Sequence, residues 1–363
     1  MSIFSADVNE SNGRTGLIEI DNKKVATPSY APTKNEFESL SLSSGIDKKD
    51  YRDIEIGEVV CWLDKDQLTN IVKKDGFYNS KKYALSADLK IITAKTKILH
   101  FNFFSDVKSL NGEQIENLLE LQYDLDVDVI QIPNHYIDLD YSRAVEKAIE
   151  WKRSKGVNKP LMGVVCKSSQ IDYLKTKFKE VESIGINLSQ FNQPTLVAVR
   201  NKLKTEDVWI HGISAPMSHE NKRGTLGVLI NYYGFDTISN PVQNWKSARG
   251  FGGSFAKMNA EQQLEKTKTQ KYFKPIDYEL PKIEDLQKIH GSKHKLSGFC
   301  SCPICTKKTI EDLLINPTMT SHFNKSHRSL SFHKESEIYQ KKLKNNESEE
   351  YLSSKPYAKQ IIG

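Results

Sequence analysis

Three cysteines close together constrain this chain more than any other feature of its sequence. They are Cys300, Cys302 and Cys305, and two histidines, His322 and His327, follow further along. Thiolates this close together, with an imidazole nearby in sequence, are typical of a tetrahedral Zn²⁺ site in which protein atoms fill every position. A closed Cys₃His site leaves no position for a substrate, so we expect a structural zinc ion. The spacing admits either histidine, and a chance cluster in a loop is the alternative.

Composition and hydropathy limit the classes of protein to which this chain can belong. A chain of 363 residues, 38% of them hydrophobic, can form one large domain or two. We expect no membrane span, because no apolar run reaches about 18 residues. We also expect no signal peptide, because no basic region followed by an apolar run opens the chain. Cys61 and Cys166 stand far apart in apolar stretches, which favours a reducing, cytoplasmic location over a disulfide framework.

Positive charge is concentrated toward the C-terminal third of the chain. The net charge is +6, but the segment from Lys246 to Lys344 alone holds 19 Lys and Arg against 10 Asp and Glu, an excess of +9. The aromatic residues Phe251, Phe255, Tyr272 and Phe273 are interspersed there. Such a stretch could bind the phosphates and bases of a nucleic acid. A solvated lysine-rich face is the alternative.

Apolar runs alternate with amphipathic runs along most of the chain. The strand-like runs are 25–30, 56–63, 97–103, 127–132, 161–166, 185–191, 208–213 and 235–240. The clearer helical patterns are 65–74, 112–123, 142–155, 169–183, 195–204 and 218–233. Buried, β-branched strands separated by helices predict an α/β fold, a (β/α)8 TIM-type barrel, with a doubly wound open sheet as the alternative.

These patterns divide the chain into four parts. Residues 1–20 are expected to be an N-terminal lead-in or hairpin, and residues 21–258 the barrel core, with an extra hairpin at 81–96. Residues 259–334 form the predicted zinc-binding subdomain, including a helix at 306–314. Residues 335–363 are expected to be a polar, basic tail.

In a (β/α)8 barrel the catalytic groups project from the carboxyl ends of the strands. That rule selects a set of candidates: Asn102, Asp106, Asn134, His135, Cys166, Lys167, His211, Ser214 and Asp236. Asp236 stands out because its strand is otherwise apolar, where a carboxylate is costly unless it is used or paired. A carboxylate so placed can form a covalent glycosyl intermediate. The alternative is a structural Asp236 that caps a turn or pairs with Arg249.

Several motifs, in their order, resemble the tRNA-guanine transglycosylase family. They cover most of the chain and are Ala26-Thr-Pro-Ser-Tyr-Ala-Pro, Leu161-Met-Gly-Val-Val, Trp209-Ile-His-Gly212-Ile-Ser-Ala-Pro, Gly234-Phe-Asp-Thr-Ile-Ser and the Cys₃ cluster with His327-Arg-Ser-Leu-Ser-Phe. The resemblance implies a (β/α)8 barrel with structural Zn²⁺ on Cys300, Cys302, Cys305 and His327. It also implies that Asp236 is the nucleophile, which displaces guanine to form a covalent glycosyl-enzyme, and that a 7-deazaguanine base such as preQ0 then displaces Asp236.

The chain departs from this family in the base pocket. Its Asp-Ser-Gly-Gly-Phe-Gln motif is absent, and the corresponding stretch runs from Leu99 to Val107, which leaves Asp106 as the candidate acid/base. Asn134 stands where the family has an aspartate, and Cys166 where it has a glutamine. Such divergence resembles the DNA-acting branch, which inserts 7-deazaguanine bases into DNA and must extract a base from a duplex.

The sequence therefore predicts a guanine transglycosylase acting on DNA, with tRNA as the alternative substrate. By position, the expected substrate-binding residues are Asn102, Asn134, Cys166, Lys167, His211 and Gly212, and the expected nucleic-acid-binding residues are Lys246, Arg249 and Lys257. Two other classes stay open: a non-catalytic partner subunit of such an enzyme, and a zinc protein that binds nucleic acid without catalysis. The resemblance also implies a homodimer, and helper proteins for strand opening are a further expectation.

Overall fold

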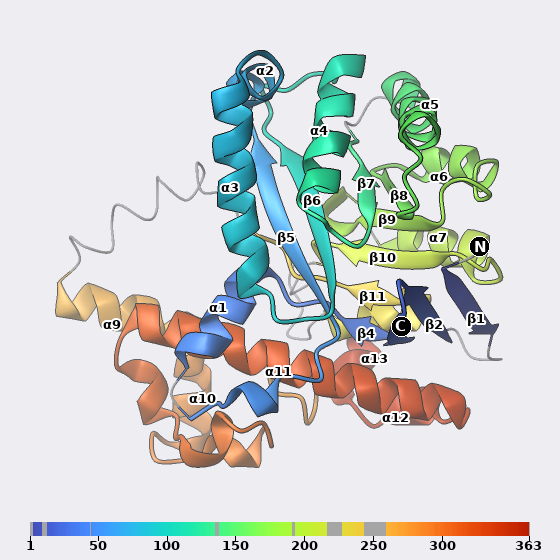
Figure 1. Ribbon diagram of the computed structural model, residues 1–363. Coiled ribbons are helices and arrows are strands. Elements are labelled where there is room, and N and C mark those ends of the chain that lie inside the picture. Colours follow the sequence, from blue (N-terminus) through green and yellow to red (C-terminus); the bar gives the residue numbers. More distant parts are fainter. Residues whose placement is uncertain are drawn as a thin grey trace.

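The chain folds into a mixed α/β structure in which most strand pairs are parallel (Figure 1). The computed structural model describes residues 3–8, 13–43, 45–134, 138–190, 193–215, 227–242 and 259–362. One sheet has the strand order β4-β11-β10-β9-β8-β7, and a second pairs β5 with β6. Their bounds are β4 Ser29–Tyr30, β5 Ile56–Leu63, β6 Thr96–Phe103, β7 Ile130–Ile132, β8 Leu161–Val165, β9 Ser183–Asn187, β10 Trp209–Ile213 and β11 Thr237–Ile238.

Two isolated parallel bridges connect the edges of these sheets. Thr33 pairs with Glu58, next to β4 and β5, and Ile98 pairs with Val129, next to β6 and β7. The α/β class with a mostly parallel sheet is therefore confirmed, while closure into a barrel stays a prediction. The expected strand at 25–30 is divided between β4 and a separate antiparallel strand, β3 (Lys23–Thr27).

Helices follow most of the parallel strands and cover their outer side (Figure 1). They are α1 Lys34–Leu42, α2 Lys65–Lys73, α3 Asp75–Ile91, α4 Gly112–Asp124, α5 Asp138–Lys155, α6 Ser168–Lys175, α7 Gln193–Leu203 and the 3₁₀ helix η3 Val228–Tyr233. The start of α4 is set by Asn111, whose side chain accepts a hydrogen bond from the Gln114 amide at 2.8 Å. None of the described helices has the length and apolar character that a membrane span requires.

The prediction of a hairpin at residues 81–96 is wrong, because α3 occupies most of that segment. Leu85 and Leu89, one helical turn apart, are buried on its inner face. The other residues of α3 are exposed or half-buried, so a one-sided helix produces the apolar run that suggested two short strands.

The N-terminal residues form a hairpin extended to three antiparallel strands, β1 (Phe4–Val8), β2 (Arg14–Ile20) and β3. The tight turn between β2 and β3 uses Asp21 and Asn22, both at positive φ, as a two-residue hairpin turn requires. Apolar residues of this sheet pack against the amino ends of the parallel strands, in a cluster of Phe4, Ile18, Ile20, Val25, Ala31, Ile56, Ile98, Val129, Met162 and Trp209. The sheet thus covers the amino end of the strands.

The C-terminal part is helical and lies along one side of the α/β body (Figure 1). It contains α9 Ala260–Lys268, α10 Ile283–His290, α11 Pro317–Lys344, α12 Ser348–Ser353 and α13 Pro356–Ile362. A helix expected at 306–314 is replaced by two 3₁₀ turns, η6 (Cys305–Lys307) and η7 (Glu311–Leu314). A subdomain boundary at residue 335 is also wrong, because α11 runs through it and buries Tyr339 and Leu343 beyond it.

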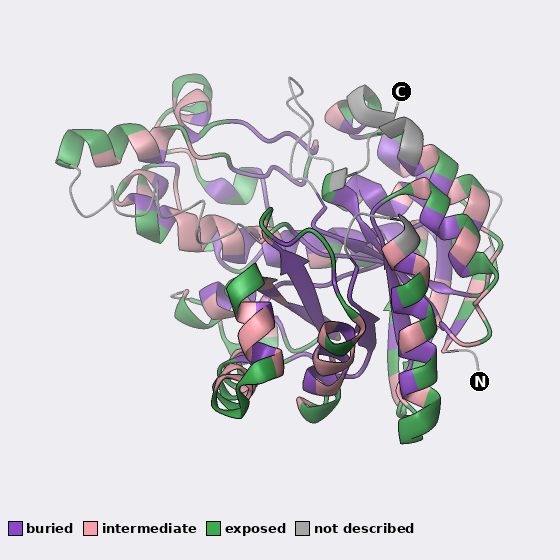
Figure 2. Cartoon of the chain, turned by 90° about the horizontal axis from the view of Figure 1, so that it is seen from above, coloured by how far each residue is buried: buried purple, intermediate pink, exposed green. Residues whose placement is uncertain are grey.

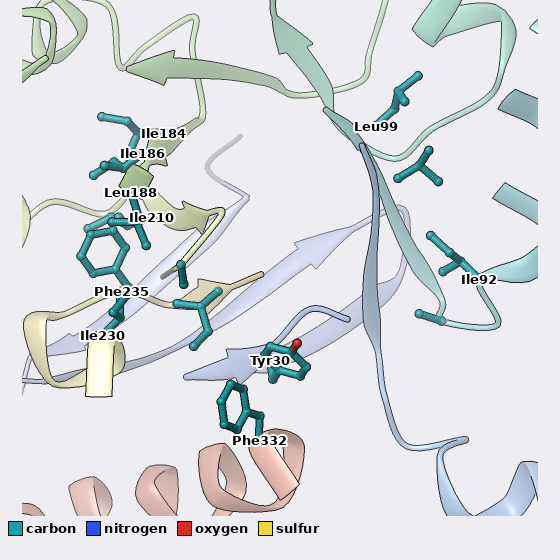
Figure 3. Packing of buried hydrophobic residues seen from close by; sticks show 14 of the residues in the cluster. Tyr30, Ile92, Leu99, Ile184, Ile186, Leu188, Ile210, Ile230, Phe235 and Phe332 are labelled. Atoms are coloured by element: carbon teal, nitrogen blue, oxygen red, sulfur yellow. The ribbon is translucent and has the colours of Figure 1, made fainter. Parts of the chain in front are cut away.

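Residues of the parallel strands are almost all buried, whereas the surrounding helices carry both buried and exposed residues (Figure 2). One group on the outer side of the strands includes Ile184, Ile186 and Phe235 (Figure 3). At another point Tyr30 of β4 meets Phe332 of α11 edge-to-face, with ring centroids 5.3 Å apart. The C-terminal helix therefore shares a core with the first parallel strand.

Glu36 fastens this junction. Its side chain is 2% exposed, and its carboxylate accepts hydrogen bonds from Tyr30 Oη at 2.7 Å, Asn240 Nδ2 at 2.8 Å and Ser329 Oγ at 3.1 Å. The Thr33 amide also donates to it, at 2.9 Å. These donors come from β4, the end of β11 and α11, so one carboxylate joins three elements that are distant in sequence.

We predict that Glu36→Gln lowers the free energy of unfolding by about 1–3 kcal/mol, because the amide group of the glutamine places donors where donors already point. Urea unfolding followed by circular dichroism measures the change. Glu38→Gln is the matched control, because Glu38 lies on the same helix in a half-exposed ion pair with Lys34. Equal stability of the two variants would contradict the role assigned to Glu36.

Candidate metal centre and the carboxyl ends of the strands

The four predicted metal ligands meet in one buried cluster. The ligand atoms of Cys300, Cys302, Cys305 and His327 all lie within 4.8 Å of one another, and all four residues are buried. His327 Nδ1 is 3.4 Å from Cys302 Sγ and 3.3 Å from Cys305 Sγ. This part of the prediction is confirmed: the cluster could hold a metal ion with three sulfur ligands and one nitrogen ligand.

Neighbouring residues fix the histidine in this orientation. His327 Nε2 donates a hydrogen bond to the Phe273 carbonyl at 2.7 Å, which leaves Nδ1 facing the sulfur atoms. The Tyr272 ring stacks on the imidazole at 4.5 Å, and its hydroxyl group lies 3.2 Å from Cys305 Sγ. Hydrogen bonds from Cys302 and Cys305 lower the pKa of the Cys300 thiol, which favours the thiolate that a metal binds.

His322 does not belong to the cluster. Its Nδ1 lies 3.1 Å from Ser39 Oγ on α1, so this histidine connects α11 to the α/β body. The prediction that Tyr272 and Phe273 stack on nucleic acid is wrong, because both are almost completely buried beside the metal ligands.

Asp236 lies at the amino end of the strands, not at their carboxyl end. It directly precedes β11, and the Ile210 amide at the start of β10 donates to its Oδ2 at 2.7 Å. Arg14 of β2 donates to both carboxylate oxygens, with Nε 2.9 Å from Oδ1. Both side chains are completely buried. Burial raises the pKa of the Asp236 carboxyl group, and the charge of Arg14 acts in the opposite direction.

This geometry corrects the assignment of Asp236 as the nucleophile. Both oxygens of the Asp236 carboxylate accept hydrogen bonds, and the N-terminal sheet covers the amino ends of the strands, where Asp236 lies. Arg14 also donates hydrogen bonds to the carbonyls of Leu203, Glu206 and Val208, so it fixes the segment that leads from α7 into β10. The alternative of a structural, arginine-paired Asp236 holds, with Arg14 as the partner rather than Arg249, which lies outside the described residues.

Several predicted pocket residues have structural contacts instead. His211 is completely buried among the strands, and a side chain at Gly212 would meet Leu188 Cδ1 at 2.8 Å, so Gly212 is a packing position. Asn134 Nδ2 donates to the Val164 carbonyl at 2.7 Å and to Gln170 Oε1 at 3.1 Å. Burial raises the pKa of the Cys166 thiol to about 12, which keeps it protonated at neutral pH.

The remaining candidates lie where the sequence placed them, at the carboxyl ends of the strands. Asn102 is 9% exposed near the end of β6, and Lys167 is exposed after β8. Asp106 is exposed beyond β6 and accepts a hydrogen bond from the Lys65 amide at 3.4 Å. Lys246, Arg249 and Lys257, together with His135, fall outside the described residues.

His211 was predicted from the sequence, but the polar layer between the strands to which it belongs was not. Glu58, His100, Gln131 and His211 are all almost completely buried, and they come from four parallel strands. Glu58 Oε2 lies 3.7 Å from His211 Nε2. The reasoning that singled out Asp236, a carboxylate in an apolar strand, applies equally to Glu58 in Ile56-Gly-Glu-Val-Val and could have found it.

Comparisons with known proteins add no relative. No protein-family model matches the chain, and no curated protein matches it.

We predict that Asp236→Asn destabilises the protein by about 3–5 kcal/mol even without any ligand, because it leaves the buried Arg14 guanidinium without its counter-charge. Guanidinium chloride unfolding measures this loss. Asp172→Asn is the matched control, because Asp172 forms an exposed ion pair with Lys202, and we expect it to cost about 0–1 kcal/mol. An Asp236→Asn variant as stable as the wild type would argue against a structural pair.

Proposed function

We propose that the eight parallel strands close into a (β/α)8 barrel. The bridges Thr33–Glu58 and Ile98–Val129 support closure, because they connect the free edges of the two sheets in both directions. The order of helices between the strands fits as well. In such a barrel the N-terminal sheet covers the bottom, and the functional site belongs at the carboxyl ends of the strands.

The Cys₃His cluster is proposed to hold a structural zinc ion. Three thiolates and one imidazole are the donor set that Zn²⁺ prefers, and no position is left for a substrate. The ion would fasten the loop from Cys300 to Cys305 onto α11. It would stabilise the C-terminal helices without entering the chemistry.

We predict about one zinc ion per purified chain, measured by inductively coupled plasma mass spectrometry. Cys305→Ser and His327→Ala should both lose the ion and lower the thermal midpoint, because each removes one of four ligands. His322→Ala is the matched control and should keep the full zinc content, since His322 contacts Ser39 instead. A loss of zinc in the control, or its retention in both ligand variants, would reject the assignment.

The proposed activity is guanine transglycosylation on nucleic acid, with DNA preferred over tRNA. The observation that supports a site most directly is the increasing exposure of inward-facing residues along β5: Glu58 is 0% exposed, whereas Val60 and Trp62 are partly exposed. The Trp62 and Phe104 rings lie 5.5 Å apart at this end, Asn102 is the residue opposite Trp62 in the strand pair, and Asp106 follows Phe104 by two residues. Aromatic faces and polar groups together suit an extruded base.

The backbone at the same end is strained. Ser214, directly after β10, has a φ of 57°, which a residue other than glycine seldom adopts. Strain of this kind concentrates at functional sites, where surrounding contacts keep it in place. The Trp62 indole also donates to the Val242 carbonyl at 3.3 Å, so the chain after β11 reaches this end of β5.

Asp106 takes the covalent step that Asp236 cannot perform. Its carboxylate oxygen bonds to C1′ of the nucleoside while the glycosidic C–N bond breaks, and the departing guanine takes a proton from water. The incoming 7-deazaguanine base then bonds to C1′, releases its proton and frees the carboxylate. Asp106 suits this role because it is exposed and lies beyond the end of β6.

DNA is preferred because the pocket motifs of the tRNA enzymes are missing from the sequence. A second candidate function, nucleic-acid binding without base exchange, is favoured by the Arg14–Asp236 pair, which removes the nucleophile that the resemblance implied. A partner subunit of a transglycosylase would be one form of this second function.

Labelled preQ0 incubated with the protein and either duplex DNA or tRNA separates these possibilities. We expect label in DNA, lost at least tenfold in Asp106→Asn and retained in the exposed control Asp172→Asn. Label in tRNA alone would reverse the substrate preference. No label in either, combined with DNA binding that weakens steeply with salt, would favour the second function.

A further inference from the structure

Asn187 is the last residue of β9 and lies on the inner face of the strands. Ile184 and Ile186 of this strand belong to the outer core (Figure 3), whereas a side chain at Gly185 would lie 3.1 Å from Met162 Sδ of the inner cluster. Because alternate strand residues share a face, Asn187 points inward, two residues closer to the carboxyl end than Gly185. It therefore lies at the end of the strands to which the proposed site belongs.

A backbone group fixes the orientation of the Asn187 side-chain amide. The Ser189 backbone N–H donates to Asn187 Oδ1 at 3.2 Å, and the Ser189 hydroxyl group lies 2.6 Å from the same atom. A backbone N–H can only donate, so the atom that it faces is the amide oxygen and the other atom is the nitrogen. Asn187 therefore presents two N–H donors in a defined direction.

These two donors are unused within the described part of the protein. The Asn187 amide nitrogen has no hydrogen-bond partner among the described residues, although the residue is only 5% exposed. Asn134, at the end of β7, is the contrast, because its amide nitrogen donates to the Val164 carbonyl at 2.7 Å and to Gln170 Oε1 at 3.1 Å. Buried polar groups usually have a hydrogen-bond partner, so an unpaired amide at this end of the strands suits a ligand with an acceptor atom.

The neighbours of Asn187 favour a neutral acceptor over a phosphate group. Ile213 of β10 is its register partner on one side. On the other side Cys166 follows Val165, the register partner of Ile186, so Cys166 lies beside Asn187. Burial raises the pKa of the Cys166 thiol to about 12, so neither neighbour carries a charge at neutral pH. Phosphate recognition relies on charged donors, whereas the carbonyl oxygen of a base is recognised by neutral N–H groups.

Backbone strain lies next to the same position. Ser214 directly follows Ile213, the register partner of Asn187, and has a φ of 57°. Its amide lies 3.4 Å from Ser239 Oγ, which belongs to the segment after β11. Strain of this kind concentrates at functional sites. The unpaired amide and the strained residue are thus two separate features at the ends of neighbouring strands.

We propose that Asn187 donates a hydrogen bond to a carbonyl oxygen of the bound base and so contributes to the choice of base. The identity of the ligand as a base rests on the proposed function. The free donor does not, because it follows from contacts within the protein.

Hydrogen exchange of the side-chain amides tests the free donor without ligand. It is measured by ¹⁵N NMR of the full chain labelled at asparagine, with Asn187→Asp and Asn134→Asp used to assign the two signals. We expect the Asn187 amide protons to exchange at least tenfold faster than those of Asn134, which are hydrogen-bonded within the protein. Equal protection of the two amides would overturn the proposal, because the Asn187 donors would already be in use.

Equilibrium dialysis with guanine and with 2-aminopurine, a purine that lacks the carbonyl oxygen, tests the recognition. We expect Asn187→Ala to bind guanine about tenfold more weakly than the wild type, as the loss of one well-placed hydrogen bond implies, and 2-aminopurine almost equally well. Asn187→Asp keeps an oxygen for the Ser189 amide and should also lose affinity for guanine. Asn117→Ala is the matched control and should bind both bases as the wild type does, because its amide donates to the Glu113 carbonyl on the exposed side of α4.

The two bases separate the possible failures. An equal loss of affinity for both bases in Asn187→Ala, or an unchanged affinity for guanine, would overturn the recognition of the carbonyl oxygen while leaving the proposed function in place. If the wild type binds neither base, the proposed function and the recognition fail together, and the exchange measurement still decides whether Asn187 holds a free donor.

Discussion

The buried ion pair between Arg14 and Asp236 fastens the N-terminal sheet over one end of the parallel strands. It holds the N-terminal sheet against the start of β10 and β11. The remaining N–H groups of the Arg14 guanidinium donate hydrogen bonds to three backbone carbonyls in the segment that leads into β10. A charged pair is stable at such depth only when its hydrogen bonds are complete, as they are here. One end of the parallel strands is thereby covered, which is why the proposed site is placed at the other end.

Three buried carboxylates show that residue type alone does not determine a role. Asp236 is paired with an arginine, Glu36 accepts hydrogen bonds from neutral donors, and Glu58 lies beside the imidazole of His211. The first two are saturated and hold elements together. Glu58 keeps oxygens without hydrogen-bond partners among the described residues, with Oε2 3.7 Å from His211 Nε2.

The sequence predicted the local features well and the pairing of distant residues poorly. The cysteine spacing identified the metal cluster, because its ligands are mostly close in sequence, and the alternation of strands and helices identified the α/β class. The partner of Asp236 lies 222 residues away, and no pattern near Asp236 indicates it. The hairpin expected at 81–96 failed for a related reason: a short apolar run is compatible with a strand or with one face of a helix, and only packing against neighbouring elements distinguishes them.

The C-terminal helices are joined to the α/β body by two different kinds of interaction. In the first half of α11 the metal ligands and the stacked Tyr272 hold His327, and one residue later Arg328 approaches Glu36, with Nε 3.7 Å from its carboxylate. Ser329 and Phe332, on the next turn, contact Glu36 and Tyr30. The metal cluster and the Glu36 junction are separated by about one helical turn, so the same part of α11 carries both. The cysteine cluster is therefore connected through a single helix to β4 and to the end of β11, the strands that border the proposed site.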